Sequence, residues 1–173
     1  MVQFDAKALE RLFVEHEQPL FNVVLRWTWN REDAAEIVQE AFGRLWAMAG
    51  RVDPPRAQAL VYRIALNLAA SRRRWHKVRT FVGIAEERPD PTANPDEDLL
   101  RRERHQTVAR AIEALPESQR RALVLCEMTE LSYAQIAAIL RTRPGTVGSR
   151  RHAALLTLRR TLADEQDNDH VTI

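Results

Sequence analysis

Two stretches of the sequence carry several cationic side chains and no acidic residue, and both could bind a polyanion. Between residues 54 and 85 there are seven Lys and Arg residues, and between residues 131 and 163 there are six arginines. Clustered cations attract nucleic acid. The same clusters are also compatible with two solvated helix faces, and charge alone does not separate these interpretations. The formal net charge of +2 conceals both stretches, because acidic residues gather elsewhere in the chain.

The residue types that carry out catalysis are not grouped in the sequence. The five histidines are scattered along the chain, and Cys126, the single cysteine, lies in an apolar run. A lone cysteine in such a run is usually a packing residue. We therefore predict that the protein is not an enzyme and that it has no catalytic residue, cofactor or metal ion.

Cysteine content and hydropathy indicate the compartment. One cysteine cannot form an intramolecular disulfide, which is typical of a reducing environment. Residues 1–10 include Asp5 and Glu10 and no apolar segment of the kind found in a signal peptide. The sequence also has no apolar run long enough to span a bilayer. We expect a cytoplasmic protein without membrane insertion.

The elements that position the two basic stretches are predicted to be helices. Apolar residues recur at helical spacing in three segments before residue 75 and again from residue 99 onward, and no useful length of chain shows strand-like alternation. Asn30 is suited to cap the second helix, with Glu32 and Asp33 in its first turn. The run Asp53-Pro54-Pro55 breaks the pattern before the third helix. The predicted fold class is all-α.

An acidic segment divides the helices into two groups. Between residues 86 and 98 there are six acidic residues, three prolines and one arginine, a composition typical of a flexible, extended linker. We predict two small helical domains, residues 1–83 and residues 105–164, joined by an acidic linker at 84–104. Residues 165–173 form an acidic tail, which we expect to be a disordered spacer.

The second domain contains the pattern of a helix-turn-helix. Ser132 can cap a short helix ending near Ile139, residues 141–143 form a turn, and Pro144 suits the first position of the next helix. In a DNA-binding helix-turn-helix, this second helix enters the major groove. Its Arg and Ser/Thr side chains can contact bases and phosphates. An ordinary helical hairpin with an arginine-rich face is the alternative interpretation of this motif alone.

Motifs in both domains resemble those of a known family. Region 4 of bacterial RNA polymerase sigma factors is similar to residues 114–125 (ALPESQRRALVL), 131–137 (LSYAQIA) and 145–150 (GTVGSR). Region 2 is similar to residues 33–46 (DAAEIVQEAFGRLW), 62–67 (YRIALN) and the arginines at 72–74. The order of these motifs, with a linker in place of region 3, resembles the small extracytoplasmic-function (ECF) sigma factors over nearly the whole chain.

This resemblance implies a function and partners. A protein of this family binds core RNA polymerase, recognises the -35 and -10 elements of promoter DNA, and helps to melt the -10 element while the polymerase performs the chemistry. Family members are also commonly held by an anti-sigma factor. A stand-alone helix-turn-helix regulator, which would dimerise on palindromic DNA, is the alternative, and the docking-type motif at 33–46 argues against it. A helical enzyme would need converging titratable groups, which the sequence does not show.

The resemblance also implies roles for individual residues. The polymerase-docking positions on the second helix are Asp33, Glu36, Gln39, Glu40, Leu45 and Trp46, with the last two divided between core and interface. The -10 positions are Asp53, Arg56, Arg63, Asn67, Arg72, Arg73, Arg74, Trp75 and Lys77, which supply charge, hydrogen bonds and a stacking plane for melted DNA. The -35 positions are Arg143, Thr146, Ser149, Arg150 and His152. We expect Tyr62 to pack in the core, and Trp75 either to stack on a base or to cover the end of the domain.

Several positions of the helix-turn-helix depart from the family pattern. Arg141 stands where the turn usually has Gly, and a non-Gly residue at positive φ costs on the order of 1 kcal/mol. Basic residues are frequent where Gly148, Ala153 and Leu155 stand, and leucine is usual at Arg151. Fewer cations on the helix mean fewer phosphate contacts and weaker binding. We therefore predict weak or unusual -35 recognition.

Overall fold

The computed structural model describes residues 4–81 and 99–169, and the regular elements in these residues are all helices. The chain divides into two compact units, Met1–Pro91 and Thr92–Ile173. None of the helices in the described ranges is both long enough and apolar enough to cross a membrane. The predicted all-α fold with two helical domains is confirmed.

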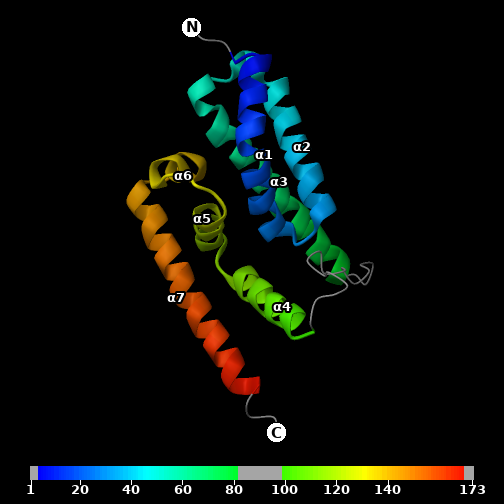
Figure 1. Ribbon diagram of the computed structural model, residues 1–173, viewed down its shortest axis with the longest axis vertical. Coiled ribbons are helices and arrows are strands. Elements are labelled where there is room, and N and C mark those ends of the chain that lie inside the picture. Colours follow the sequence, from blue (N-terminus) through cyan, green and yellow to red (C-terminus); the bar gives the residue numbers. More distant parts are fainter. Residues whose placement is uncertain (1–3, 82–98, 170–173) are drawn as a thin grey trace. The chain divides into compact units, whose positions relative to one another are not determined.

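Three helices form the first unit: α1 (Ala6–Thr28), α2 (Arg31–Ala47) and α3 (Pro54–Phe81), with a short 3-10 helix, η1 (Ala49–Arg51), before α3 (Figure 1). Each of the three α-helices packs on the other two. Their inward faces supply the core, whose fully buried side chains include Leu20, Val23, Val24, Trp27, Ile37, Leu45, Tyr62 and Leu66. Tyr62 therefore packs in the core, as expected.

Side-chain caps set where the first two helices begin. Asp5 accepts a hydrogen bond from the backbone N–H of Ala8 at 2.8 Å, and Asn30 accepts one from the N–H of Asp33 at 2.9 Å. Each cap satisfies a first-turn amide that has no partner within the helix. The predicted cap at Asn30 is confirmed, and it fixes Asp33 in the first turn of α2.

Four helices form the second unit: α4 (Leu99–Ala114), α5 (Glu117–Met128), α6 (Tyr133–Leu140) and α7 (Pro144–Asp169). The long helix α7 packs on each of the other three (Figure 1). The core between them includes Leu123, Leu125, Ile136, Ile139, Val147 and Ala154. Because only part of its surface is apolar, α7 buries one side and leaves the other exposed.

The helices α6 and α7 form the predicted helix-turn-helix. Ser132 caps α6 in a capping box with Gln135, in which each side chain bonds the other residue's backbone N–H. Arg141 ends α6 with a φ of 52°, and the N–H groups of Arg141 and Thr142 both reach the carbonyl of Ala137. Pro144 then begins α7. The turn at residues 141–143 is confirmed, including a non-Gly residue in the left-handed region.

Two predicted boundaries differ from the structure. The sequence predicts a disordered spacer from residue 165, but α7 continues to Asp169 because no Gly or Pro after Gly148 ends it earlier. Residues 99–104 of the predicted linker 84–104 belong to α4, since helical apolar spacing resumes at Leu99. The linker positions up to residue 98 and the end of the tail, residues 170–173, lie outside the described residues.

Candidate polymerase-docking and nucleic-acid surfaces

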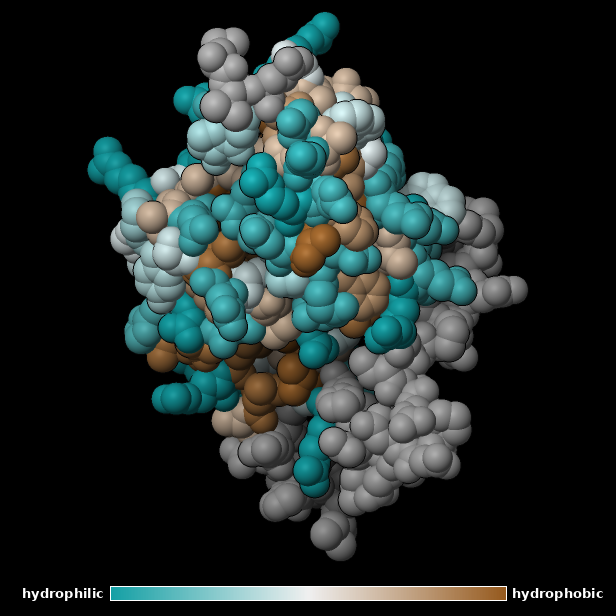
Figure 2. Space-filling view, turned by 45° about the horizontal axis from the view of Figure 1, so that its top comes forward, coloured by the Kyte–Doolittle hydropathy of each residue, from teal (hydrophilic) through white to brown (hydrophobic). Residues whose placement is uncertain are grey.

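The coloured part of the face seen in Figure 2 is largely hydrophilic, and apolar side chains interrupt it. Teal, hydrophilic residues cover most of the face seen in Figure 2, with apolar patches between them. Among the described residues of the first unit, the exposed large apolar side chains are Val14, Trp46, Met48 and Trp75. Two of these, Trp46 and Trp75, are residues that the sequence predicts at binding surfaces.

The predicted docking residues of α2 fall into two groups. Glu36, Gln39 and Glu40 are exposed along the helix, and Glu40 forms an ion pair with Arg44 at 2.6 Å. Trp46 is 47% exposed at the end of the same helix, whereas Leu45 is fully buried. The division of these two residues between surface and core is the one expected. The exposed group gives α2 an acidic face that ends in an indole.

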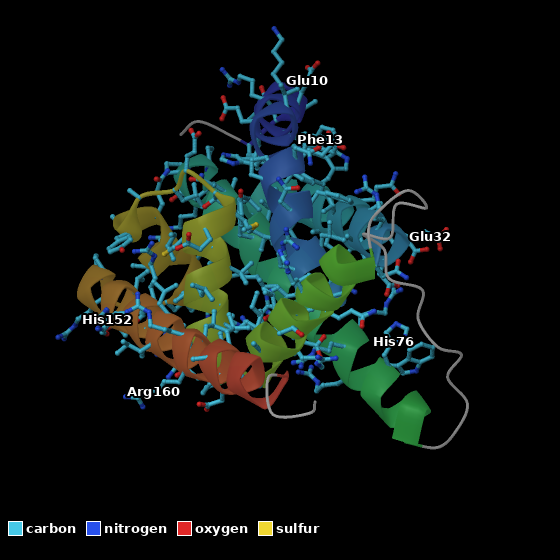
Figure 3. The ribbon with its side chains drawn as sticks, turned by 60° about the horizontal axis from the view of Figure 1, so that its bottom comes forward. Glu10, Phe13, Glu32, His76, His152 and Arg160 are labelled. Atoms are coloured by element: carbon cyan, nitrogen blue, oxygen red, sulfur yellow. The ribbon has the colours of Figure 1, made fainter. Side chains whose placement is uncertain are left out.

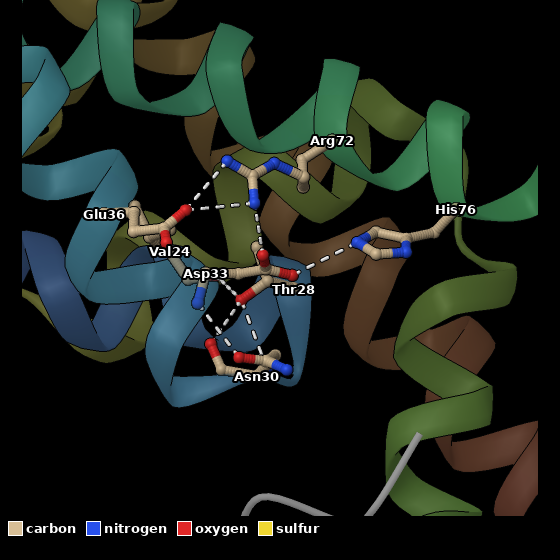
Figure 4. A network of polar contacts seen from close by, with 7 residues as sticks. All are labelled: Val24, Thr28, Asn30, Asp33, Glu36, Arg72 and His76. Atoms are coloured by element: carbon tan, nitrogen blue, oxygen red, sulfur yellow. Dashed lines mark hydrogen bonds and ion pairs between the residues drawn. The ribbon is translucent and has the colours of Figure 1, made fainter. Parts of the chain in front are cut away.

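Asp33, the remaining docking candidate, is buried and engaged within the protein. It is 8% exposed. Its Oδ1 accepts a hydrogen bond from Nη1 of Arg72, and its Oδ2 lies 3.3 Å from Nε2 of His76 (Figure 4). Arg72 and His76 are one turn apart on α3, so a single carboxylate of α2 holds the same face of α3 at two points.

The joint between α1 and α2 supports this carboxylate. Thr28 donates from Oγ1 to the carbonyl of Val24 at 3.2 Å and to that of Asn30 at 3.1 Å (Figure 4). Asn30 in turn caps α2 at Asp33. The positive end of the helix dipole also favours a carboxylate in the first turn. The position of Asp33 is therefore fixed by both its backbone and its side-chain partners.

Arg72 also contacts the acidic face of α2. Its Nη1 and Nη2 donate to Oε2 of Glu36 at 3.3 and 3.2 Å. Burial by itself would lower the pKa of Arg72, but the hydrogen bonds and the charges of Glu36 and Asp33 together raise this pKa above its ordinary value. The guanidinium is therefore held in its charged form between two carboxylates. The structure thus joins two residues predicted for docking with one predicted for DNA.

The outward face of α3 carries a different set of side chains. Asn67, Ser71 and Arg74 recur at helical spacing and are exposed, and Arg74 donates from Nη2 to Oγ of Ser71 at 3.0 Å. Trp75 is 51% exposed, and its ring meets the ring of His76 edge to face at a centroid distance of 5.1 Å. An exposed indole beside a cationic helix face is suited to stack on an unpaired base.

The other predicted -10 residues differ in accessibility. Asp53 and Arg56 are exposed at the start of α3, where they form an ion pair at 3.4 Å. Arg63 is half-buried and donates from Nε to the carbonyl of Ala59 at 3.2 Å, and Arg73 is half-buried as well. Lys77 belongs to α3 by its backbone, but its side chain lies outside the described part of the structure.

The predicted -35 residues lie in the turn before α7 and in its first three turns. Arg143, Ser149 and His152 are exposed, and Thr146 and Arg150 are half-buried. His152 projects away from the helix, as does Arg160 two turns later (Figure 3). Ser149 donates from Oγ to the carbonyl of Thr146 at 3.1 Å. The structure thus brings hydroxyl, imidazole and guanidinium groups to the beginning of α7.

Two of the unusual residues of α7 contact neighbouring helices. Arg151 donates from Nε to Oε1 of Glu127 on α5 at 2.8 Å, and hydrogen bonds to Glu127 and Tyr133 raise the pKa of Arg151. The ring of Tyr133 lies against Gly148, where an added Cβ would be 3.3 Å from Cε2. These two departures from the family pattern therefore connect α5, α6 and α7.

Sequence reasoning missed the contacts of His76, Tyr133 and Glu127. The spacing of Arg72 and His76, four residues apart in a predicted helix, was a signal that both face one neighbour. Tyr133 and Gly148 carried no such signal, because their contact depends on how closely α6 approaches α7.

Comparisons with known proteins identify the family. Residues 12–78 match the family model of Sigma-70 region 2, and residues 105–158 match that of Sigma-70, region 4. The ECF RNA polymerase sigma-E factor of Escherichia coli strain K12 is 34% identical over 157 residues, which cover 84% of this chain and 82% of that protein. The ECF RNA polymerase sigma factor SigE of Mycolicibacterium smegmatis is 28% identical over 157 residues, and the match spans 89% of this chain and 61% of SigE.

A solved structure shows a similar fold. The sigma factor RpoE from Bartonella quintana, in complex with the anti-sigma factor NepR, matches with a TM-score of 0.64 and 22% identity over 91% of this chain and 98% of that chain. The two family models occur in the same order as the two helical units, and the region 4 match contains α6 and α7 as far as residue 158. The chain belongs to the ECF RNA polymerase sigma factors.

Proposed function

We propose that this sigma factor binds core RNA polymerase through the exposed face of α2 and directs it to promoters through α3 and the beginning of α7. The observation that carries this assignment is within the first unit. One three-helix body presents an acidic face on α2 and a cationic face with an exposed tryptophan on α3. Such a body can bind a basic protein surface and melted DNA with different helices.

The docking surface consists of Glu36, Gln39, Glu40 and Trp46. Carboxylates on an exposed helix face pair with basic residues across an interface and set the register of the partner. A half-exposed tryptophan supplies the large apolar contact that commonly dominates binding energy. Asp33 is assigned a positioning role instead, because its carboxylate is already held by Arg72 and His76.

The -10 surface consists of the outward side of α3 and the loop before it. Arg74 and Asn67 supply charge and hydrogen bonds to the melted strand, and Trp75 offers a plane for an unstacked base. Asp53 and Arg56 lie at the start of the helix, where a flipped base would need a pocket edge. Arg72 contributes chiefly by holding α3 against α2.

The -35 surface is the beginning of α7, which would enter the major groove of the DNA. Arg143, Thr146, Ser149, Arg150 and His152 form this surface, and arginine can read guanine edges or neutralise phosphates. Gly148 and Arg151 are used for contacts with α5 and α6. Because Gly148 supplies no cation where the family frequently has a basic residue, and its surface lies against Tyr133, we propose that -35 binding is weak and that region 2 carries more of the promoter specificity.

The protein acts in the cytoplasm without catalysing a reaction, and the polymerase performs the phosphoryl transfer. Burial raises the pKa of the Cys126 thiol, which fits a packing group better than a nucleophile. An anti-sigma factor is proposed as a further partner, by analogy with the RpoE–NepR complex.

Core binding and promoter opening test the two surfaces of the first unit separately. Trp46→Ala should weaken binding to core polymerase, whereas Trp75→Ala should leave core binding unchanged and reduce strand opening in the assembled holoenzyme. Glu10→Gln, which changes an exposed acid of α1, is the control for a surface charge. A folded wild-type chain that fails to bind core polymerase would overturn the function itself and favour a stand-alone regulator.

The proposed weakness of -35 binding has its own test. The promoters are identified by mapping the transcripts that the holoenzyme makes. The affinity of the holoenzyme for these promoters should fall little when the -35 box is scrambled and the -10 element is kept. The E. coli sigma-E holoenzyme on its own promoter is the comparison. An equally large loss of affinity for both proteins would overturn the proposal that -35 binding is weak in this protein.

A further inference from the structure

The resemblance to the family places Glu36 at the polymerase and Arg72 at the DNA, yet in the free protein the two residues bind each other. Two nitrogens of the guanidinium donate to one oxygen of Glu36 at 3.2 and 3.3 Å. We propose that this ion pair couples the two surfaces: when Glu36 is drawn to a basic residue of the polymerase, Arg72 gains a free donor edge for a DNA phosphate. This inference rests on the proposed function.

The two carboxylates that hold Arg72 differ in how easily they can be exchanged. The side chain of Asp33 is 12% exposed, and that of Glu36 is 65% exposed. Asp33 also contacts His76 and belongs to the capped first turn of α2, so leaving it would strand a buried carboxylate. Glu36 can turn toward another cation without such a loss. Asp33 is therefore the permanent partner of Arg72 and Glu36 the exchangeable one.

The accessibility of Arg72 fits this division. Its side chain is 31% exposed, so part of the guanidinium edge reaches solvent beside Glu36. The neighbouring residues Arg73, Arg74 and Trp75 belong to the predicted -10 surface, and the freed nitrogens of Arg72 would add to that surface. A phosphate contact of this kind is independent of base sequence.

The size of the coupling follows from the exposure of the pair. An exposed ion pair changes a binding constant by a factor of up to about five. Coupling between two ligands is reciprocal, so DNA held by Arg72 would strengthen polymerase docking through Glu36 by the same factor. The pair would thus lower the affinity of the free sigma factor for DNA and restore it in the holoenzyme.

The experiment measures the affinity of the isolated full-length chain for fluorescein-labelled oligothymidylate at low salt. Glu36→Gln removes the exchangeable partner of Arg72, and Glu32→Gln removes an exposed acid one turn earlier on α2 as the matched control. We expect both variants to bind more tightly than wild type, since each removes one negative charge. The gain should be about two- to fivefold larger for Glu36→Gln.

Repeating the measurement in a variant of Arg72 tests whether the larger affinity increase of Glu36→Gln depends on Arg72. In the Arg72→Gln background, Glu36→Gln and Glu32→Gln should increase the affinity for oligothymidylate by the same factor. Arg72→Lys serves if Arg72→Gln does not fold, because a lysine ammonium does not present the two-pronged edge that reaches both carboxylates. The coupling would be overturned if both glutamate variants increased the DNA affinity equally in the wild-type background. It would also be overturned if the larger increase for Glu36→Gln persisted in the Arg72→Gln background. Failure of the wild-type chain to bind either core polymerase or single-stranded DNA would count against the proposed function instead.

Discussion

The aromatic ring of Tyr133, the first residue of α6, lies directly against Gly148 on α7. A Cβ atom added at Gly148 would be 3.3 Å from Cε2 and 3.9 Å from Cδ2 of the ring. The first distance is shorter than an ordinary van der Waals contact, so the absence of a side chain at residue 148 sets how closely the two helices approach. Tyr133 is 42% exposed and can yield by a small rotation.

Gly148→Ala should therefore stabilise the second unit by less than the roughly 1 kcal/mol that alanine gains over glycine in an open helix. Displacing the ring of Tyr133 costs part of the free energy that alanine gains over glycine. In a Tyr133→Ala background the same substitution should recover the full amount. The free energy of unfolding is measured by urea denaturation followed by circular dichroism. Gly43→Ala on α2, where nothing lies within 4 Å of the added Cβ, gives the unhindered reference; equal gains in both Tyr133 backgrounds would refute the contact.

Arg141 adopts a backbone conformation that suits glycine better. Its φ is 52° and its side chain is exposed. Arg141→Gly should raise the free energy of unfolding of the second unit by about 0.5–1 kcal/mol, because the left-handed conformation costs a residue with a Cβ but not glycine. Arg141→Ala is the control, since it removes the same side chain and keeps the Cβ. A gain of similar size in the alanine variant would show that charge, and not φ, is responsible.

Asp33 and Glu36 should differ sharply in their effect on stability. Asp33→Ala removes the buried carboxylate that holds Arg72 and His76 and should lower the free energy of unfolding of the first unit by on the order of 3 kcal/mol. Glu36→Ala removes an exposed partner and should cost less than about 1 kcal/mol. All four tryptophans lie in the first unit, so their fluorescence reports its unfolding. Similar costs for the two variants would contradict the assignment of Asp33 as the buried anchor.

The features that could be predicted from the sequence are local. Asn30 and Ser132 cap their helices because each side chain reaches a backbone amide three residues ahead. Pro144 begins α7 for an equally local reason. The exposed residues of the docking face could also be predicted, because helical spacing separates Leu45 from Trp46. Local geometry of this kind depends on a few consecutive residues and can therefore be predicted from the sequence.

The contacts that could not be predicted join residues far apart in the chain. Asp33 and Arg72 are 39 positions apart, and Glu127 and Arg151 are 24 apart. Resemblance to the family placed Asp33 at an interface and Arg72 on DNA, because each residue was considered on its own helix. Only the packing of α2 on α3 shows that the two bind each other. The extent of α7 was missed for a different reason, since an acidic composition does not by itself end a helix.

A histidine between α1 and α3 should make the stability of the first unit depend on pH. Nε2 of His16 lies 3.1 Å from Nε2 of Gln58, and its Nδ1 lies 3.4 Å from the hydroxyl of Tyr62. Burial lowers the pKa of His16 below 6.5, and Glu15 only partly opposes this shift. The unfolded chain therefore takes up a proton at a higher pH than the folded one. The stability associated with neutral His16 is complete above pH 6.5 and falls as the pH drops through that value toward the folded pKa.

His16→Gln removes this titration while keeping a polar side chain beside Gln58 and Tyr62. The difference in free energy of unfolding between wild type and His16→Gln should shift in favour of the variant as the pH falls from about 7.5 to about 5.5. Tryptophan fluorescence during urea denaturation measures it, because the four tryptophans lie in the same unit as His16. His152 is an exposed histidine of the second unit. His152→Gln should leave the pH dependence of the unfolding of the first unit unchanged. A constant difference between wild type and His16→Gln across this range would mean that His16 binds its proton equally well in the folded and unfolded chains.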